Sequence, residues 1–150
     1  MNTEIGFGRK VLDVFERNGI SFEHMPSGID TMSIFLHQSE FEKQEQSVIA
    51  GIHRAVAPDH LELDSDLALI AVVGRGMKSA RGTAGRIFSA LAHARVNVKM
   101  IDQGSSELNI IIGVKNEDFE TAVKAIYGYL CDGSALRWKT GTDFCRIWHL

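Results

Sequence analysis

Two stretches of the chain, residues 6–36 and 82–112, repeat each other at a constant offset of 76 residues (82 − 6). Apolar positions coincide between the copies: Val11/Ile87, Leu12/Phe88, Phe15/Leu91, Ile20/Val96, Phe22/Val98, Met25/Ile101, Met32/Leu108, Ile34/Ile110 and Leu36/Ile112. Gly28 and Gly104 coincide as well. A repeat of this kind indicates two copies of one small module with a natural interface between them.

The apolar periodicity of the first copy predicts two helices and several short strands. The predicted elements are a helix from Phe7 closing at Asn18-Gly19, strands over 20–25 and 32–36 around a Pro26-Ser27-Gly28 turn, a helix with its apolar stripe at 48–56, and a strand begun by Leu61 and Leu63. Glycine takes the left-handed conformation cheaply at a helix end, and the second helix must stop near Pro58. The polar stretch 37–46 is expected to be a connection.

The second copy shows the same pattern, preceded by a nearly continuous apolar run. The predicted elements are a buried strand over 66–74, a helix carrying Ile87 to Ala94, strands over 96–101 and 108–114 around a turn at Gly104, and a helix over 119–130 with Asn116 as its N-cap. This order is typical of the ferredoxin-like βαββαβ arrangement, an antiparallel sheet with two helices on one face.

The predicted fold class is therefore α+β, with two ferredoxin-like modules over residues 1–64 and 65–130. The first module is expected to lack its opening strand, because the counterpart of 66–74 would precede Met1. We therefore expect the chain to be a piece of a longer protein. The segment 131–150 lies outside the repeat, and we expect it to be a tail of uncertain origin that is dispensable for ligand binding.

Composition is that of a soluble globular protein. The 150 residues carry 16 basic and 19 acidic side chains without a basic cluster, so we expect no nucleic-acid partner. No apolar run approaches the ~20 residues of a membrane span, and no signal-peptide core is present. The two cysteines are more consistent with free thiols than with a disulfide. We expect a cytoplasmic protein without a membrane partner.

Motifs for cofactor or metal chemistry are not found. The loop GRGMKSARG at 74–82 fails as a phosphate-binding loop, because Met77 stands where the motif needs glycine before Lys-Ser. The six histidines and two cysteines match no metal-ligand spacing, and no nucleophile elbow occurs. We therefore expect no cofactor, no metal and no catalytic residue. A glycine-containing loop entering a helix still exposes N–H groups that favour a carboxylate, at Gly82 and likewise at Gly6 and Gly8.

The segments ISFEHMPSGID, DLALIAVVGRGM and VNVKMIDQGSSELNI resemble the C-terminal regulatory region of aspartokinases, most closely the single-function Gram-positive type of the lysine pathway. The resemblance covers roughly residues 1–130. It implies a tandem pair of ACT modules that dimerises and binds lysine, threonine or both as feedback inhibitors. An attached kinase domain would phosphorylate the side-chain carboxylate of aspartate. That domain is absent from this chain, which we therefore expect not to be an enzyme by itself.

Three alternatives to a kinase regulatory region remain. The first is a stand-alone ACT-type small-molecule-binding protein, which the missing opening strand disfavours. The second is an RNA-binding module of the same layout, which would need exposed aromatics and a basic face. The third is an enzyme on this fold, for which no catalytic constellation is visible.

The effector site is predicted where the first module's opening loop meets the strand that follows its first helix. The candidate residues are Thr3, Gly6, Phe7, Gly8, Ser21, Phe22, Glu23, Ser27, Asp30, Asn97 and Val98. Loop N–H groups would hold the α-carboxylate, and carbonyls near Phe22 would accept from the α-ammonium. The resemblance implies that Glu23 lies beside the effector and that Asn97 contacts it from the second module.

The identity of the effector depends on polar side chains with alternative interpretations. Glu23, or Asp30 failing that, would face a cationic group and so suits lysine. Asn97 and Ser27 would suit the hydroxyl of threonine. Both carboxylates are also consistent with ordinary solvated positions, and for Asp30 this interpretation is favoured. We expect lysine first and threonine second.

Overall fold

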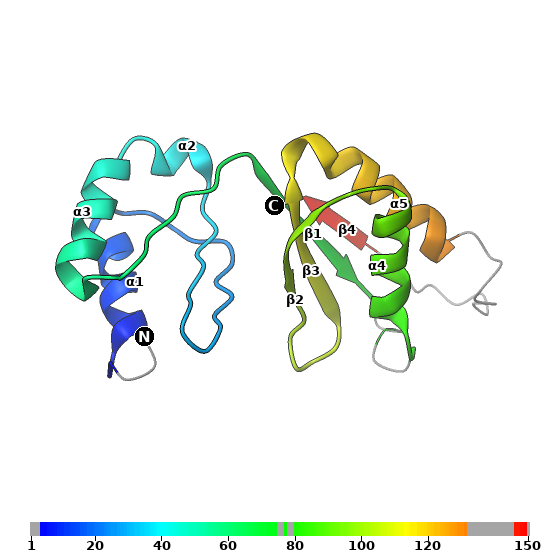
Figure 1. Cartoon of the computed structure of the whole chain (residues 1–150), viewed down its shortest axis with the longest axis horizontal. Coiled ribbons are helices and arrows are strands. Elements are labelled where there is room, and N and C mark those ends of the chain that lie inside the picture. The colour runs from blue at the N-terminus through cyan, green and yellow to red at the C-terminus, as the bar shows by residue number, and fades with distance from the viewer. Residues whose placement is uncertain (1–3, 75–76, 78–79, 132–145, 150) are drawn as a thin grey trace. The chain divides into compact units, whose positions relative to one another are not determined.

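The computed structural model describes residues 4–74, 77, 80–131 and 146–149. Contacts divide the chain into two compact units, Met1–Ser65 and Asp66–Leu150. Each unit has its own hydrophobic core. Figure 1 shows the helices and strands of each unit. None of the helices in the described residues has the length and apolar composition needed to span a membrane.

The first unit packs α1 (Phe7–Arg17) against α3 (Glu45–Val56), with the short helix α2 (Gln38–Phe41) before α3. The buried residues of this core are Val11, Val14, Phe15, Ile20 and Val48. Gly51 lets the two helices approach closely, because a Cβ built there would lie 2.6 Å from Val14 Cγ1. The two predicted helices of this unit are confirmed, and Gly19 has the expected positive φ of 64°.

The predicted strands of the first unit are wrong as continuous strands. The hairpin between α1 and α2 contains only two isolated antiparallel bridges, His24–Phe35 and Ser27–Met32. Pro26 has no N–H to donate, and the described part of this unit offers no central strand against which the hairpin could extend its ladder. The segment from Leu61 to Leu63 is likewise not a strand. Helix α2 was not predicted from the polar stretch that contains it.

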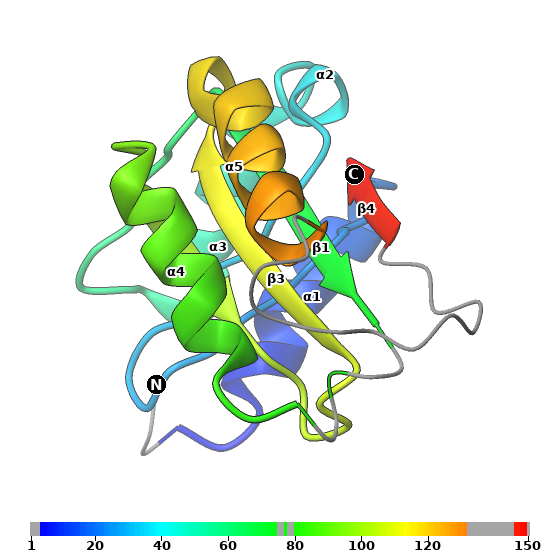
Figure 2. The ribbon, with the colours of Figure 1, turned by 90° about the vertical axis from the view of Figure 1, so that its right-hand side faces the viewer.

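The second unit is an antiparallel sheet of four strands in the order β2-β3-β1-β4. The strands are β1 (Leu67–Val73), β2 (Val98–Asp102), β3 (Asn109–Lys115) and β4 (Arg146–His149). Helices α4 (Thr83–His93) and α5 (Phe119–Cys131) pack together on one face (Figure 2). The core between sheet and helices consists of Ala68, Ile70, Val72, Ile87, Leu91, Val96, Ile110, Ile112, Val114, Ala122 and Ile126. The expected α+β, ferredoxin-like fold is confirmed.

Strand register explains the buried run that the sequence shows. β1 pairs with β3 from Leu67–Lys115 to Val73–Asn109, so both central strands bury alternate residues under the helices. β2 pairs with β3 on the other side, with a register shift between Val98 and Met100. A Cβ on Gly113 would lie 3.1 Å from Met100 Cβ, which places the backbone of β3 close against β2 at this point.

Two expectations at the end of this unit need correction. Asn116 is not the N-cap of α5, because it opens a 3₁₀ turn (Asn116–Asp118) while its N–H donates to Asp66 O at 2.7 Å. The helix consequently starts at Phe119. The backbone of 146–149, which we expected to lie outside the module, forms β4 and pairs with Ile70–Val73 of β1. An unpaired strand edge is the physical reason that such a segment is taken up. Residues 132–145, including Cys145, lie outside the described part.

Candidate functional site

Each unit begins its first helix with the same local structure. Gly6 precedes α1 with φ 78° and ψ 15°, and Gly82 precedes α4 with φ 78° and ψ 9°. Neither helix has a side-chain hydrogen bond at its N-cap. This left-handed conformation favours glycine. The Phe7 N–H donates to Glu4 O at 3.3 Å. The other N–H groups of the first turns are left for a partner other than a capping side chain, which favours an anion.

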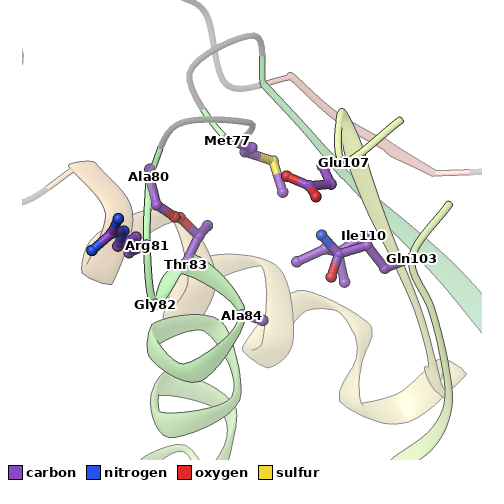
Figure 3. A pocket seen from close by; sticks show the side chains of 9 residues that line it. All are labelled: Met77, Ala80, Arg81, Gly82, Thr83, Ala84, Gln103, Glu107 and Ile110. Carbon is purple, nitrogen blue, oxygen red and sulfur yellow. The ribbon is translucent and has the colours of Figure 1, made fainter. Parts of the chain in front are cut away.

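In the second unit this helix start opens onto a pocket of about 490 Å³ (Figure 3). The lining residues are Met77, Ala80, Arg81, Gly82, Thr83, Ala84, Gln103, Glu107 and Ile110. The apolar part of the lining comes from Met77, Ala80, Ala84 and Ile110. The acidic group of the lining is Glu107, whose side chain and that of Met77 point toward one another. The Arg81 side chain points away from Glu107.

The turn between β2 and β3 positions the acidic wall of this pocket. Glu107 has a positive φ of 56°, and its N–H donates to Gly104 O at 3.0 Å. The N–H of Gly74, just after β1, donates to Leu108 O at 3.1 Å and ties the turn to the central strand. A left-handed non-glycine residue is uncommon and often marks a functional position.

The loop before α4 forms the opposite wall. The Thr83 hydroxyl donates to Ala80 O at 2.8 Å, which fixes the loop on the first turn of the helix. A small zwitterion fits this chemistry: its carboxylate would bind the helix N–H groups, its ammonium Glu107, and its aliphatic part the apolar lining. The described residues contain no group of three or more His, Cys, Asp and Glu side chains arranged to hold a metal ion.

Only some of the predicted effector residues of the first unit lie near one another, at the start of α1. Thr3 lies outside the described residues, and Gly6 is the N-cap of α1. Phe7 starts that helix and packs on the core. A Cβ on Gly8 would lie 4.0 Å from Met32 Cε, and Met32 bridges to Ser27. The start of α1 therefore lies beside the Ser27–Met32 part of the hairpin.

Glu23 lies at the other end of the hairpin. Its N–H donates to Phe35 O at 2.9 Å, and its carboxylate pairs with His37 Nε2 at 3.0 Å. Ser21 and Phe22 beside it are exposed, as is Asp30 near the hairpin tip. The structure therefore brings Ser27 toward the predicted carboxylate-binding loop, and it brings Glu23 to His37.

Asn97 and Val98 do not line the pocket of their own unit. Asn97 is exposed immediately before β2, and Val98 pairs with Val114 at the far end of β3. The pocket residue Gln103 follows the opposite end of β2. A contribution of Asn97 and Val98 to a site would therefore have to be made toward another module.

The predicted effector residues include none of the residues that line the pocket of the second unit, although the loop at Gly82 was expected to favour a carboxylate and the repeat contains the same signal. Adding 76 to the predicted residues Gly6, Phe7 and Gly8 gives Gly82, Thr83 and Ala84, which line the pocket. The residue 76 positions after Ser27 is Gln103, which also lines the pocket. Transferring the predicted residues of the first copy to the second copy by this offset therefore identifies four of the residues that line the pocket.

Comparisons with known proteins point to one family. An ACT domain model matches residues 70–130. Aspartokinase 3 of Bacillus subtilis is 45% identical over 128 residues, which cover 85% of this chain and 28% of that protein. The crystal structure of Clostridium acetobutylicum aspartate kinase is 45% identical with a TM-score of 0.84, over 89% of this chain and 31% of that one.

A more distant solved structure agrees. Aspartokinase III of E. coli, solved in complex with lysine and aspartate, is 25% identical with a TM-score of 0.68, over 87% of this chain and 29% of that one. The chain spans less than a third of the length of these relatives. The family model, the relatives and the fold thus agree that the chain carries the ACT fold and resembles the C-terminal regulatory region of aspartokinases, as its sequence predicts.

Proposed function

We propose that this chain is an amino-acid-sensing regulatory region of an aspartate kinase, without catalytic activity of its own. The observation that carries the proposal is the repeated glycine-led helix start without a side-chain cap, which in the second unit opens onto a pocket of about 490 Å³. The relatives are aspartokinases, which favours a kinase regulatory region over a stand-alone ACT-type protein.

In the first unit the effector's α-carboxylate would bind the N–H groups of Gly6, Phe7 and Gly8, with Thr3 in the same loop. The helix dipole adds about 0.3–2 kcal/mol to such a contact. Ser27 is the side chain of the predicted set that the hairpin brings toward this end, through its bridge to Met32.

The remaining predicted groups complete the site from elsewhere. Carbonyls near Phe22 would accept from an ammonium, and Glu23 or Asp30 would face a cationic side chain. Asn97 and Val98 would close the site from the second module of this chain or of another copy. A site completed from another module is consistent with the position of Gly8 beside Met32 at one end of the hairpin and of Glu23 at the other end.

Lysine is the first effector candidate and threonine the second. The lysine complex of the E. coli relative and the carboxylates at Glu23 and Glu107 support a cationic amino acid. Ser27, Thr83 and Asn97 would serve the hydroxyl of threonine.

The mechanism would be a population shift. An effector that binds one arrangement of two subunits better than another stabilises that arrangement, and a coupling of about 1–3 kcal/mol is typical. In the intact protein this arrangement would disable an attached kinase domain. The fragment is therefore expected to form a homodimer through its ACT modules.

Calorimetric titration of the purified chain with L-lysine and L-threonine tests the proposal, with D-lysine as the control. Saturable heat from at least one L-amino acid, and none from D-lysine, is the expected result. No heat from either L-amino acid would remove the sensor function. Aspartate-dependent ADP release by the purified chain would contradict the non-catalytic assignment.

A further inference from the structure

Lys10 and Arg86 occupy equivalent positions of the two repeats (10 + 76 = 86), each as the fourth residue of its helix. Their backbone N–H groups donate to the carbonyls of Gly6 and Gly82, both at 3.0 Å. The helix starts are thus alike in backbone, and a cationic side chain extends from the same place in each.

The two cations differ in their partners. The Lys10 ammonium is paired with the carboxylate of Glu4. The residue at the position of Glu4 in the second repeat is Ala80, which has no carboxylate. The repeat therefore keeps the cation but replaces its acidic partner with a methyl group.

Arg86 is left with unused hydrogen-bond capacity. Its Nη2 donates to Thr83 Oγ1 at a long 3.4 Å, while Nε is buried and has no acceptor in the described part of the chain. A guanidinium carries five donors, and a buried donor without an acceptor is costly. The side chain is half-buried, so water reaches it only in part.

Arg86 is not itself among the residues that line the pocket of the second unit, and its link to that pocket is the hydrogen bond to Thr83. Thr83, which accepts from Arg86, and Ala80, which stands in the place of Glu4, both line that pocket. We propose that Arg86 is the residue that recognises a ligand's carboxylate in this pocket, and that this carboxylate takes the place that the Glu4 carboxylate has beside Lys10.

The proposal deepens the proposed function and rests on it for the class of ligand, which is a small carboxylate such as an amino acid. The pocket combines the uncapped start of α4, suited to a carboxylate, with Glu107, suited to an ammonium, and Arg86 lies next to its lining residue Thr83. The first unit differs because Glu4 already neutralises its cation. Of the two helix starts, the one in the second unit therefore has a cation without an internal carboxylate partner in the described part of the chain.

Acetate is the probe that tests Arg86 without requiring an amino-acid effector. The side-chain Nε–H signal of Arg86 in a ¹⁵N-resolved NMR spectrum of the full chain should shift with sodium acetate and not with sodium chloride at equal ionic strength. In Ala80→Glu the internal carboxylate should pair with Arg86, and the acetate-induced shift should fall at least about tenfold. Ala80→Gln, of equal size without charge, should keep the response.

A second variant approaches the same question from the other repeat. Glu4→Ala should free Lys10 and make the acetate response at the amides of Gly6 and Gly8 stronger than in wild type. This arm keeps the proposal testable even if Ala80→Glu fails to fold.

The proposal would be overturned if acetate did not shift the Arg86 Nε–H signal in wild type. It would also be overturned if the shift in Ala80→Glu were as large as in wild type. Its failure is distinguishable from failure of the proposed function. If calorimetry shows binding of lysine or threonine while acetate leaves the Arg86 Nε–H signal unshifted, only this inference is refuted. An acetate response without heat from either amino acid would refute only the sensor function.

Discussion

Gly6 and Gly82 stand 76 residues apart in the sequence and have the same φ of 78° at the start of equivalent helices. The two copies therefore share a left-handed backbone conformation as well as apolar side chains. Residues other than glycine adopt this conformation only at a cost in free energy. In both units the space around the glycine is open, with nothing within 4 Å of the point where a Cβ would lie. The conformation, rather than crowding, is therefore the reason for glycine.

The first prediction concerns this conformation. Gly82→Ala should lower the free energy of unfolding by about 1–2 kcal/mol, because L-residues are strained in the left-handed region. Gly85→Ala is the matched control: Gly85 lies inside α4 with open space around it, and alanine there should stabilise by about 0.5–1 kcal/mol. Urea unfolding of both variants measures the difference. Equal stabilities would show that Gly82 can leave its conformation freely.

The second prediction concerns the acidic wall of the pocket. Glu107→Gln keeps the size of the side chain and removes its charge, so binding of an amino acid to the second unit should weaken by about tenfold. Glu117→Gln, an exposed carboxylate in the 3₁₀ turn, is the control and should bind as wild type does. Calorimetry with lysine and threonine compares the two variants. An unchanged Kd in Glu107→Gln would exclude Glu107 as the ammonium contact.

The third prediction concerns Glu23 in the first unit. Glu23→Gln should weaken lysine binding by about 10- to 150-fold, corresponding to a charge-assisted hydrogen bond of about 1.5–3 kcal/mol. Threonine binding should change much less, since threonine has no cationic side chain. Glu16→Gln on the exposed side of α1 makes the same charge change away from the hairpin. Lysine affinity that is equal in both variants would remove Glu23 from the site.

The fourth prediction concerns β4. A chain ending at Cys131 lacks the strand that pairs with Ile70–Val73, so the outer edge of β1 loses its hydrogen-bond partners. We expect a loss of about 1–3 kcal/mol in the free energy of unfolding and a greater tendency to associate. A chain ending at His149 keeps β4 and is the control. Thermal unfolding and sedimentation measure both effects, and equal behaviour of the two chains would show that β4 is dispensable.

Elements with strong local signals were predictable from the sequence alone. The apolar stripe of α1, the stop at Asn18-Gly19 and the continuous apolar run of β1 each depend on neighbours within a few residues. The repeat itself also indicated the ferredoxin-like class, because both copies needed the same buried positions. These properties require only periodicity and the conformational preferences of glycine and proline.

Tertiary structure decided what depends on a distant partner. The hairpin of the first unit has the apolar alternation of β2 and β3 but forms only isolated bridges, because a ladder needs a neighbouring strand such as β1. The register of β1 on β3, with the Gly74–Leu108 hydrogen bond, brings Glu107 to the start of α4, a relation that no local pattern encodes. The glycine-led start of α4 is a local feature, whereas hydrogen bonding across the sheet placed Glu107 in the same pocket.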